Sequence, residues 1–230
     1  MTRQENERLQ VAIDGPAGAG KSSLAKALAQ RLGAVYVDTG AIYRAVGLSI
    51  VRQGGDCRKP EDVLPRLPEI KLTLDFGSDG LQRMYLNGED VTEAIRDNAV
   101  SAYASQVSAI PEVRAFLLEM QRQLAAEQSV VMDGRDIGTV VLPQAQVKIF
   151  LTASPEQRAL RRWKELRAKG QEADLAVIQA EIIQRDYDDS HRAAAPLRRA
   201  EDAVEVDTSA LNLEESLEAL YAVVKERAGR

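Results

Sequence analysis

The sequence contains a single cysteine, Cys57, and a single histidine, His191. One cysteine cannot form a disulfide within the chain, and one histidine builds neither a zinc site nor a catalytic triad. No apolar run approaches the roughly 20 residues that a membrane span needs, and the first ten residues are too polar for a secretion signal. We therefore expect a cytoplasmic protein without a membrane partner.

Aromatic residues are scarce, and the formal net charge is -5. This charge argues against a general nucleic-acid binder. The 230 residues and 45% hydrophobic content suit one soluble domain with its own core. We expect a monomer.

The order of elements at the start predicts a parallel sheet covered by helices. Short apolar strands are expected at residues 9–13 and 34–37, with helices at 22–32 and 42–51. Further core strands are expected at 130–132, 147–151 and 203–206. Helices are expected at 111–127, 155–168, 175–188 and 213–227, with Ser154 and Asp174 as caps.

The pattern between residues 60 and 98 is different. Apolar residues alternate over 70–76 and return over 81–86, with turn residues at 77–80 and the hairpin signal Asn87-Gly88. Antiparallel hairpins do not belong inside a parallel core. This stretch is therefore predicted to be an insert.

The most specific motif is Gly15-Pro16-Ala17-Gly18-Ala19-Gly20-Lys21-Ser22, which matches G-x-x-x-x-G-K-[ST]. It lies between a predicted strand and a predicted helix, as a phosphate-binding loop (P-loop) requires. Backbone N–H groups and the helix N-terminus favour bound phosphate. Lys21 is expected to reach the β- and γ-phosphates, and Ser22 to ligate Mg²⁺. A glycine-rich connecting turn is the simpler alternative.

Two classes of P-loop protein remain open at this point: a hydrolysing switch and a small-molecule kinase. The base-reading segment Asn-Lys-x-Asp of a regulatory GTPase does not occur. Arginines at helical spacing, Arg158, Arg161 and Arg162, and two more at Arg185 and Arg192 favour a kinase lid over two polyanions. Each arginine alone could equally belong to a solvated helix face.

Two further segments carry candidate site residues. Asp133 ends an apolar strand and suits an outer-sphere Mg²⁺ partner, while Arg135 and Asp136 follow where open α/β sheets bind ligands. In the segment 38–44, Arg44 could clamp a phosphate and Tyr43 could pack on a base. An Asp-Gly turn and a capped helix start are the plain alternatives.

Together these segments resemble the bacterial cytidylate kinase family. The resemblance rests on residues 13–21, 38–44 and 133–141, supported by 104–114 and 185–197, and it runs in order over about residues 10–208. It implies an α/β fold: a three-layer P-loop core, an antiparallel acceptor-binding insert and a helical lid. It also implies transfer of a phosphoryl group from ATP to CMP or dCMP with Mg²⁺. A kinase for another monophosphate, such as UMP, is the nearest alternative.

The resemblance also implies boundaries and roles. The core would comprise about 8–52, 111–153 and 200–230, the insert about 53–110 and the lid about 154–199. The implied catalytic residues are Lys21, Arg135, Arg158, Arg162, Arg185 and Arg192. ATP would contact Gly15, Pro16, Ala17, Gly18, Ala19, Gly20, Lys21, Ser22, Ser23, Asp207 and Thr208. CMP would contact Thr39, Tyr43, Arg44, Ser105, Arg114, Arg135, Asp136, Arg185, Asp189 and Arg192, and the metal Ser22 and Asp133.

Overall fold

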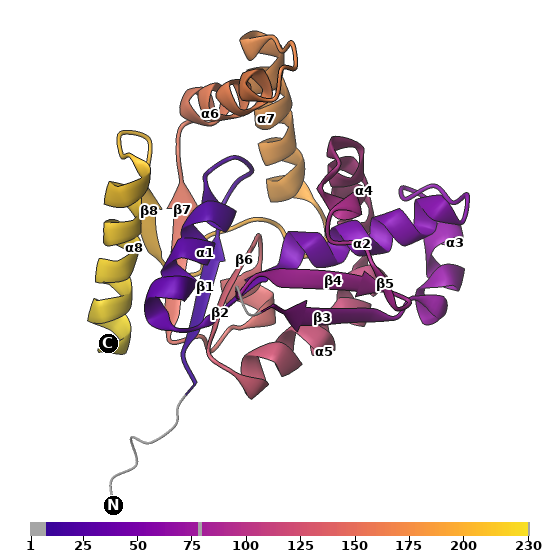
Figure 1. The fold of residues 1–230 in the computed structure, drawn as a ribbon, viewed down its shortest axis with the longest axis horizontal. Helices are drawn as coiled ribbons and strands as arrows, with labels where there is room; N and C mark the ends of the chain where they lie inside the picture. Colours follow the sequence, from indigo (N-terminus) through magenta and orange to yellow (C-terminus); the bar gives the residue numbers. More distant parts are fainter. Residues whose placement is uncertain (1–7, 78–79, 230) are drawn as a thin grey trace, which may run out of the picture.

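The computed structural model describes residues 8–77 and 80–229. A five-stranded sheet in the order β2-β6-β1-β7-β8 forms its centre, and every pairing in this sheet is parallel (Figure 1). Its strands are β1 (Gln10–Asp14), β2 (Val35–Asp38), β6 (Val130–Gly134), β7 (Val147–Thr152) and β8 (Val204–Asp207). Because all five run the same way, their carboxyl ends share one edge of the sheet, where ligands bind in folds of this kind.

Helices cover both faces of the sheet. Val11 and Ile13 of β1 pack against α1 (Lys21–Leu32) and α8 (Leu213–Ala228). Ala12, between them, faces the other side and packs against α5 (Pro111–Glu127) and the one-turn π-helix η3 (Ile137–Val141). The alternation of side chains along a strand thus produces the expected three layers.

A small antiparallel sheet lies beside this core. It contains β3 (Leu72–Phe76), β4 (Gln82–Leu86) and β5 (Glu89–Asp90). Asn87 and Gly88 both have positive φ, 51° and 86°, as the predicted tight hairpin requires. Of the other predicted turn, Ser78 and Asp79 lie outside the described residues.

Helices pack the small sheet onto the rest of the molecule. They are α2 (Thr39–Arg52), α3 (Pro60–Val63), η1 (Leu64–Glu69), η2 (Ala94–Arg96) and α4 (Asn98–Ser108). Their shared apolar core extends to Leu117 of α5. Helix α4 is absent from the sequence-based prediction, because its serines and β-branched residues are weak helix formers. Tertiary packing stabilises it instead: it crosses α2 so closely that a Cβ on Gly47 would lie 2.6 Å from that of Tyr103.

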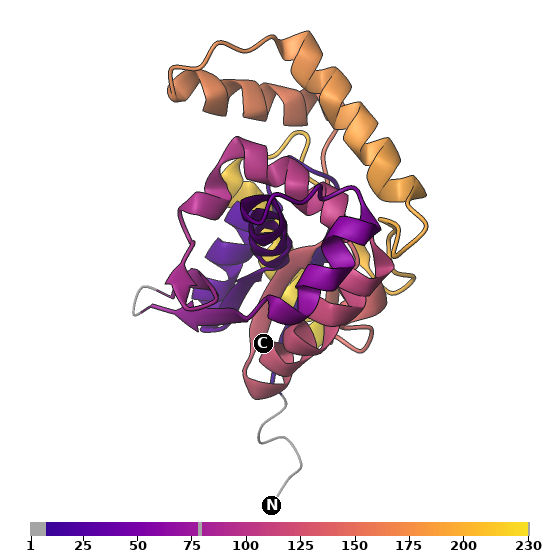
Figure 2. The ribbon, with the colours of Figure 1, turned by 90° about the vertical axis from the view of Figure 1, so that its right-hand side faces the viewer.

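Two helices stand apart above the carboxyl edge of the sheet, α6 (Pro155–Ala168) and α7 (Leu175–His191) (Figures 1 and 2). Both predicted caps are confirmed: Ser154 Oγ accepts from the Gln157 N–H, and Asp174 Oδ1 from the Ala176 N–H. A small core around Ala159, Ile178 and Ile182 joins the two helices. This α6–α7 hairpin therefore has its own packing, separate from the sheet.

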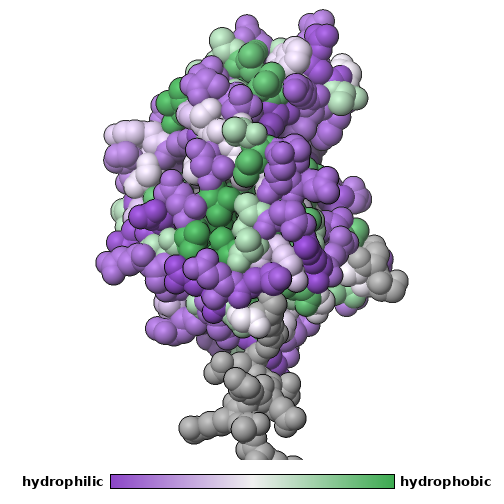
Figure 3. Space-filling view, turned by 90° about the vertical axis from the view of Figure 1, so that its left-hand side faces the viewer, coloured by the Kyte–Doolittle hydropathy of each residue, from purple (hydrophilic) through white to green (hydrophobic). Residues whose placement is uncertain are grey.

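The surface agrees with the composition. On the side that α8 covers, hydrophilic residues surround a small hydrophobic area (Figure 3). Over residues 8–77 and 80–229, every helix is too short or too polar to serve as a membrane span.

Candidate nucleotide site

The P-loop begins directly after β1, at the middle of the sheet's carboxyl edge. Gly15 has φ 150°, and a Cβ there would lie 1.9 Å from the carbonyl oxygen of Leu151, so only glycine fits. Gly18 and Gly20 have φ 74° and 91°. These left-handed conformations curl the backbone before α1 begins at Lys21, as a phosphate cradle requires.

Lys21 is buried and donates a hydrogen bond from Nζ to the Pro16 carbonyl oxygen over 2.8 Å. Burial, and then the nearby Arg135 guanidinium, lower the pKa of this ammonium group. A polyphosphate bound in the loop would place negative charge beside Lys21 and so favour its protonated, charged form. The Lys21 side chain therefore lies across the loop, where its ammonium group could bind an anion.

Ser22, at the start of α1, and Asp133, near the end of β6, are in contact. The Ser22 hydroxyl donates to Asp133 Oδ2 over 3.1 Å, and the Tyr36 hydroxyl donates to Oδ1 over 2.9 Å. Burial raises the pKa of Asp133. Among the described residues, no cluster of three or more acidic, histidine or cysteine ligands exists. One hydroxyl and one carboxylate suit Mg²⁺, which takes most of its other oxygen ligands from phosphates and water.

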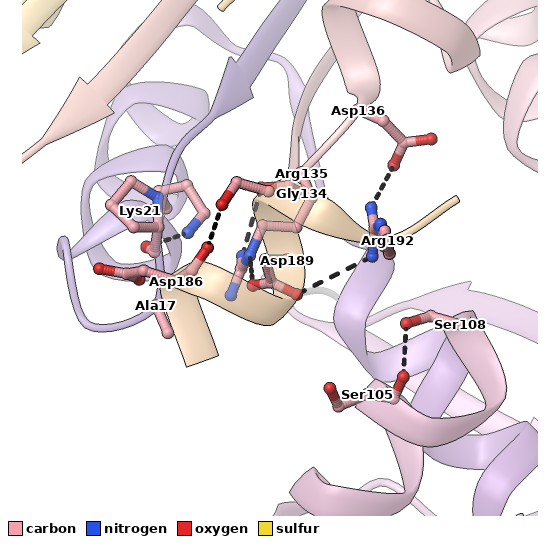
Figure 4. Close-up of polar contacts among 12 residues, drawn as sticks. Ala17, Lys21, Ser105, Ser108, Gly134, Arg135, Asp136, Asp186, Asp189 and Arg192 are labelled. Carbon is pink, nitrogen blue, oxygen red and sulfur yellow. Dashed lines mark hydrogen bonds and ion pairs between the residues drawn. The ribbon is translucent and has the colours of Figure 1, made fainter. Parts of the chain in front are cut away.

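A chain of charged groups runs from Arg135 through Asp189 to Arg192 and Asp136 (Figure 4). Arg135 Nε donates to Asp189 Oδ2 over 2.9 Å, joining the end of β6 to α7. Arg192, at the end of α7, lies 3.9 Å from both Asp189 and Asp136. The α6–α7 hairpin is thus tied to the sheet edge by charge rather than by apolar packing.

Three arginines in or near this cluster have buried nitrogen atoms without a hydrogen-bond partner: Arg44 Nε, Arg185 Nε and Arg192 Nη2. Burial lowers the pKa of Arg185 and of Arg192, and a neighbouring guanidinium, Arg135 or Arg114, lowers it further. Buried donors without acceptors are costly, and crowded cations repel. A bound anion such as a phosphate would relieve both problems.

The far end of the cluster has donors and acceptors suited to a base. The Asp136 carboxylate pairs with Arg114 and also faces Arg192. Arg114 donates to the Ser108 carbonyl oxygen over 3.2 Å and lies over the Tyr43 ring, 5.5 Å from its centroid. Ser105 lies beside this group on α4, where Ser108 Oγ donates to its carbonyl (Figure 4).

Several residues assigned to ligands in the sequence analysis have internal contacts here. The Thr39 hydroxyl donates to the Asp133 carbonyl over 2.7 Å, and the Thr208 hydroxyl to the Thr152 carbonyl over 3.1 Å. Arg158 is buried and donates to Ala17 O and to Asp186, each over 3.0 Å. Arg162 pairs with Glu165 one turn along α6 and is part-exposed. Arg158 in this conformation therefore holds the P-loop backbone against α7.

Two residues that lie at the site in the structure, Arg161 and Asp38, were not among the predicted site residues. Arg161 donates to Thr208 O over 2.6 Å and to Ala19 O over 3.3 Å, so it connects the P-loop to the loop after β8. Its spacing of three from Arg158 places both on one helix face, which is a usable signal. Asp38 caps α2 through Ala41 and also holds Arg44 over 2.7 Å.

The fold and the site define a P-loop phosphotransferase, and the arginine cluster beside the P-loop offers donors for a second anion. The P-loop, the Ser22–Asp133 pair and the arginine cluster lie along one edge of a parallel sheet. Two neighbouring anion sites are what a kinase for a phosphorylated small molecule requires.

The chain belongs to the cytidylate kinase family. The family model described as cytidylate kinase matches residues 11–226. A protein from Caldicellulosiruptor bescii named cytidylate kinase is 50% identical over 227 residues, covering 95% of this chain and 98% of the relative. Another of that name, from Desulfitobacterium hafniense, is 47% identical and covers 96% of this chain and 94% of its own length.

A solved structure with a similar fold comes from Eubacterium ventriosum. It is described as an uncharacterized protein, aligns over 97% of this chain and 100% of its own, and is 12% identical with a TM-score of 0.51. This similarity supports the α/β fold and adds nothing on activity.

Proposed function

We propose that this enzyme transfers the γ-phosphoryl group of ATP to CMP or dCMP, giving ADP and CDP or dCDP. The observation that carries the proposal is the set of buried guanidinium nitrogens without acceptors on Arg44, Arg185 and Arg192. Arg192 belongs to the charged cluster that leads from Arg135 to the Arg114–Asp136 pair. Arg185 lies near Arg135, Asp189 and Arg44, whose charges act on its pKa. An acceptor phosphate would sit at these nitrogens, with its base toward α4.

The donor end would be formed by residues 15–23, with Lys21 on the β- and γ-phosphates. Ser22 and Asp133 would hold Mg²⁺, which supplies charge neutralisation to the phosphates when bound. Asp207 and Thr208 would lie near the adenine. Arg161 supports this position, since it already ties Thr208 to the P-loop.

The acceptor end would read cytosine by matching donors to acceptors. Cytosine presents an N4 amino donor and the N3 and O2 acceptors. A carboxylate such as Asp136 accepts from N4, and Arg114 donates to the acceptors. Ser105 and Tyr43 would complete the base site, and Asp189 would contact the ribose.

The acceptor phosphate would be held by Arg44, Arg135 and Arg192, with Thr39 beside them. We also propose that the chain divides into a core (8–52, 111–153, 200–230), an insert (53–110) and a lid (154–199). The lid would bring Arg158, Arg162 and Arg185 over the transferring group. Phosphoryl transfer needs positioning and charge neutralisation rather than a covalent intermediate, and closure keeps water from being the acceptor.

We further propose a cytoplasmic monomer that acts on nucleotides and not on nucleic acids. Cys57 is buried and free, which suits a reducing compartment.

A substrate panel tests the proposal. The kcat/KM for CMP, dCMP, UMP and AMP is measured with ATP in a coupled assay for ADP. We expect CMP and dCMP to be the best acceptors by about tenfold or more, because Asp136 accepts from a cytosine amino group that uracil lacks. A clear preference for UMP would contradict the base assignment.

A further inference from the structure

Asp14, the last residue of β1, makes a contact that its position next to the P-loop does not suggest. It is buried, and its two carboxylate oxygens accept the N–H groups of Ile137 and Gly138, each over 2.7 Å. These two residues begin the one-turn helix η3. The first N–H groups of a helix have no partner inside it, so a carboxylate from across the sheet satisfies them.

The contact fixes the main chain at Asp136. On one side of the Asp136–Ile137 peptide, the N–H is held by Asp14. On the other side, the Asp136 carbonyl accepts from the Val140 N–H over 2.9 Å. The N–H and C=O groups of this peptide are therefore both held, at opposite edges of its plane, and this restrains the backbone from which the Asp136 side chain leaves.

The same residue is covalently bonded to the P-loop, since Gly15 follows Asp14. Asp14 also pairs in register with Gly134, the residue before Arg135. One side chain thus connects the loop that cradles the donor phosphates to the segment that carries Arg135 and Asp136. A shift of this segment would change the distance between the two nucleotides.

We propose that Asp14 is a positioning residue that sets the acceptor segment 135–138 against the P-loop, so that Arg135 and Asp136 meet the acceptor at the correct distance from the donor. The inference rests on the proposed function. Asp14 itself contacts neither nucleotide, and its effect passes through the backbone of residues 136–138.

The variant Asp14→Asn tests this role because it keeps the shape and loses one acceptor. Its NH₂ group would face a backbone N–H, and one of the two hydrogen bonds is lost. We expect KM for CMP to rise about tenfold and kcat to fall, with KM for ATP changed less than about twofold. Selectivity for CMP over UMP should fall as well.

Asp202→Asn is the matched control. Asp202 pairs with Lys148 over 2.8 Å, and the Lys148 side chain packs beside Gly138. This change removes an ion pair behind the same segment without touching the Ile137 or Gly138 N–H. It should lower stability and leave both KM values unchanged. Equal effects of the two variants on KM for CMP would overturn the positioning role.

Amide hydrogen exchange in the wild-type chain gives a readout independent of activity and of the folding of any variant. The Ile137 and Gly138 N–H groups should be protected without nucleotide, and fast exchange at both would overturn the inference. Failure of the wild-type chain to use CMP would instead contradict the proposed function, and the exchange result would still decide whether Asp14 holds the segment.

Discussion

Arg135 and Asp189 form an ion pair of 2.9 Å between the end of strand β6 and helix α7. Burial alone would raise the pKa of Asp189, but the Arg135 guanidinium beside it lowers the pKa below the usual value. The carboxylate therefore stays ionised and holds the α6–α7 hairpin to the sheet. An acceptor phosphate at this point would compete with Asp189 for Arg135, so binding and hairpin position are linked.

The first prediction concerns the P-loop lysine. Lys21→Ala should lower kcat about a hundredfold or more with every acceptor, because the Lys21 ammonium group is the cation held inside the P-loop itself. Lys26→Ala, on the same helix, is the control and should leave turnover within about twofold of wild type. Steady-state ADP release measures both. Retained turnover in Lys21→Ala would remove its assigned role.

The second prediction concerns base selectivity. Asp136→Ala should raise KM for CMP about tenfold or more and leave ATP binding unchanged, because the P-loop is untouched. It also leaves the buried Arg114 guanidinium without its carboxylate. Calorimetric titration with each nucleotide separates the two effects. An unchanged KM for CMP would count against Asp136 as the base reader.

Much of this arrangement is predictable from local sequence. The P-loop, the caps Ser154 and Asp174 and the Asn87-Gly88 turn depend on neighbouring residues, so the pattern alone indicates them. The positions of the parallel strands along the chain and the antiparallel hairpin follow from apolar periodicity. These expectations are confirmed by the fold.

Other features depend on pairs far apart in the chain. Asp14 meets residues 137 and 138, and Arg158 meets Asp186, only after the sheet and the hairpin have formed. Helix α4 forms because Gly47 lets it approach α2. Local propensity carries no information on such contacts, so α4, η3 and the role of Asp14 were absent from the sequence-based prediction.

The third prediction is one of stability. Arg158 is buried and paired with Asp186, so Asp186→Ala should destabilise the fold by about 3 kcal/mol, because it leaves an unpaired buried charge. Glu165→Ala removes the exposed partner of Arg162 and should cost no more than about 0.5 kcal/mol. Urea unfolding compares the two. Similar decreases in the free energy of unfolding for the two variants would show that the buried Arg158 guanidinium does not need the Asp186 carboxylate.

The fourth prediction concerns pH. Burial raises the pKa of Asp14 from 3.8 to about 6, so the folded chain holds this proton more tightly than the unfolded chain. Its contribution to stability is complete below pH 3.8 and decreases as pH rises through about 6. Relative to Asp14→Asn, the wild-type free energy of unfolding should fall by about 2 kcal/mol between pH 4 and pH 7.

Urea unfolding of the wild type and of Asp14→Asn between pH 4 and pH 7 measures the difference in their free energies of unfolding. The contributions of the other titrating groups largely cancel in this difference. A difference that stays constant, or that increases with pH, would show that burial does not dominate at Asp14.

The most direct measurement is the rate of ADP release from ATP and Mg²⁺ with and without CMP, together with the appearance of CDP. Two anion sites joined by an arginine cluster predict negligible ADP release without CMP, a saturable increase with CMP and one CDP for each ADP. An ADP release rate that is the same at every CMP concentration would contradict phosphoryl transfer to the nucleotide and indicate a hydrolase.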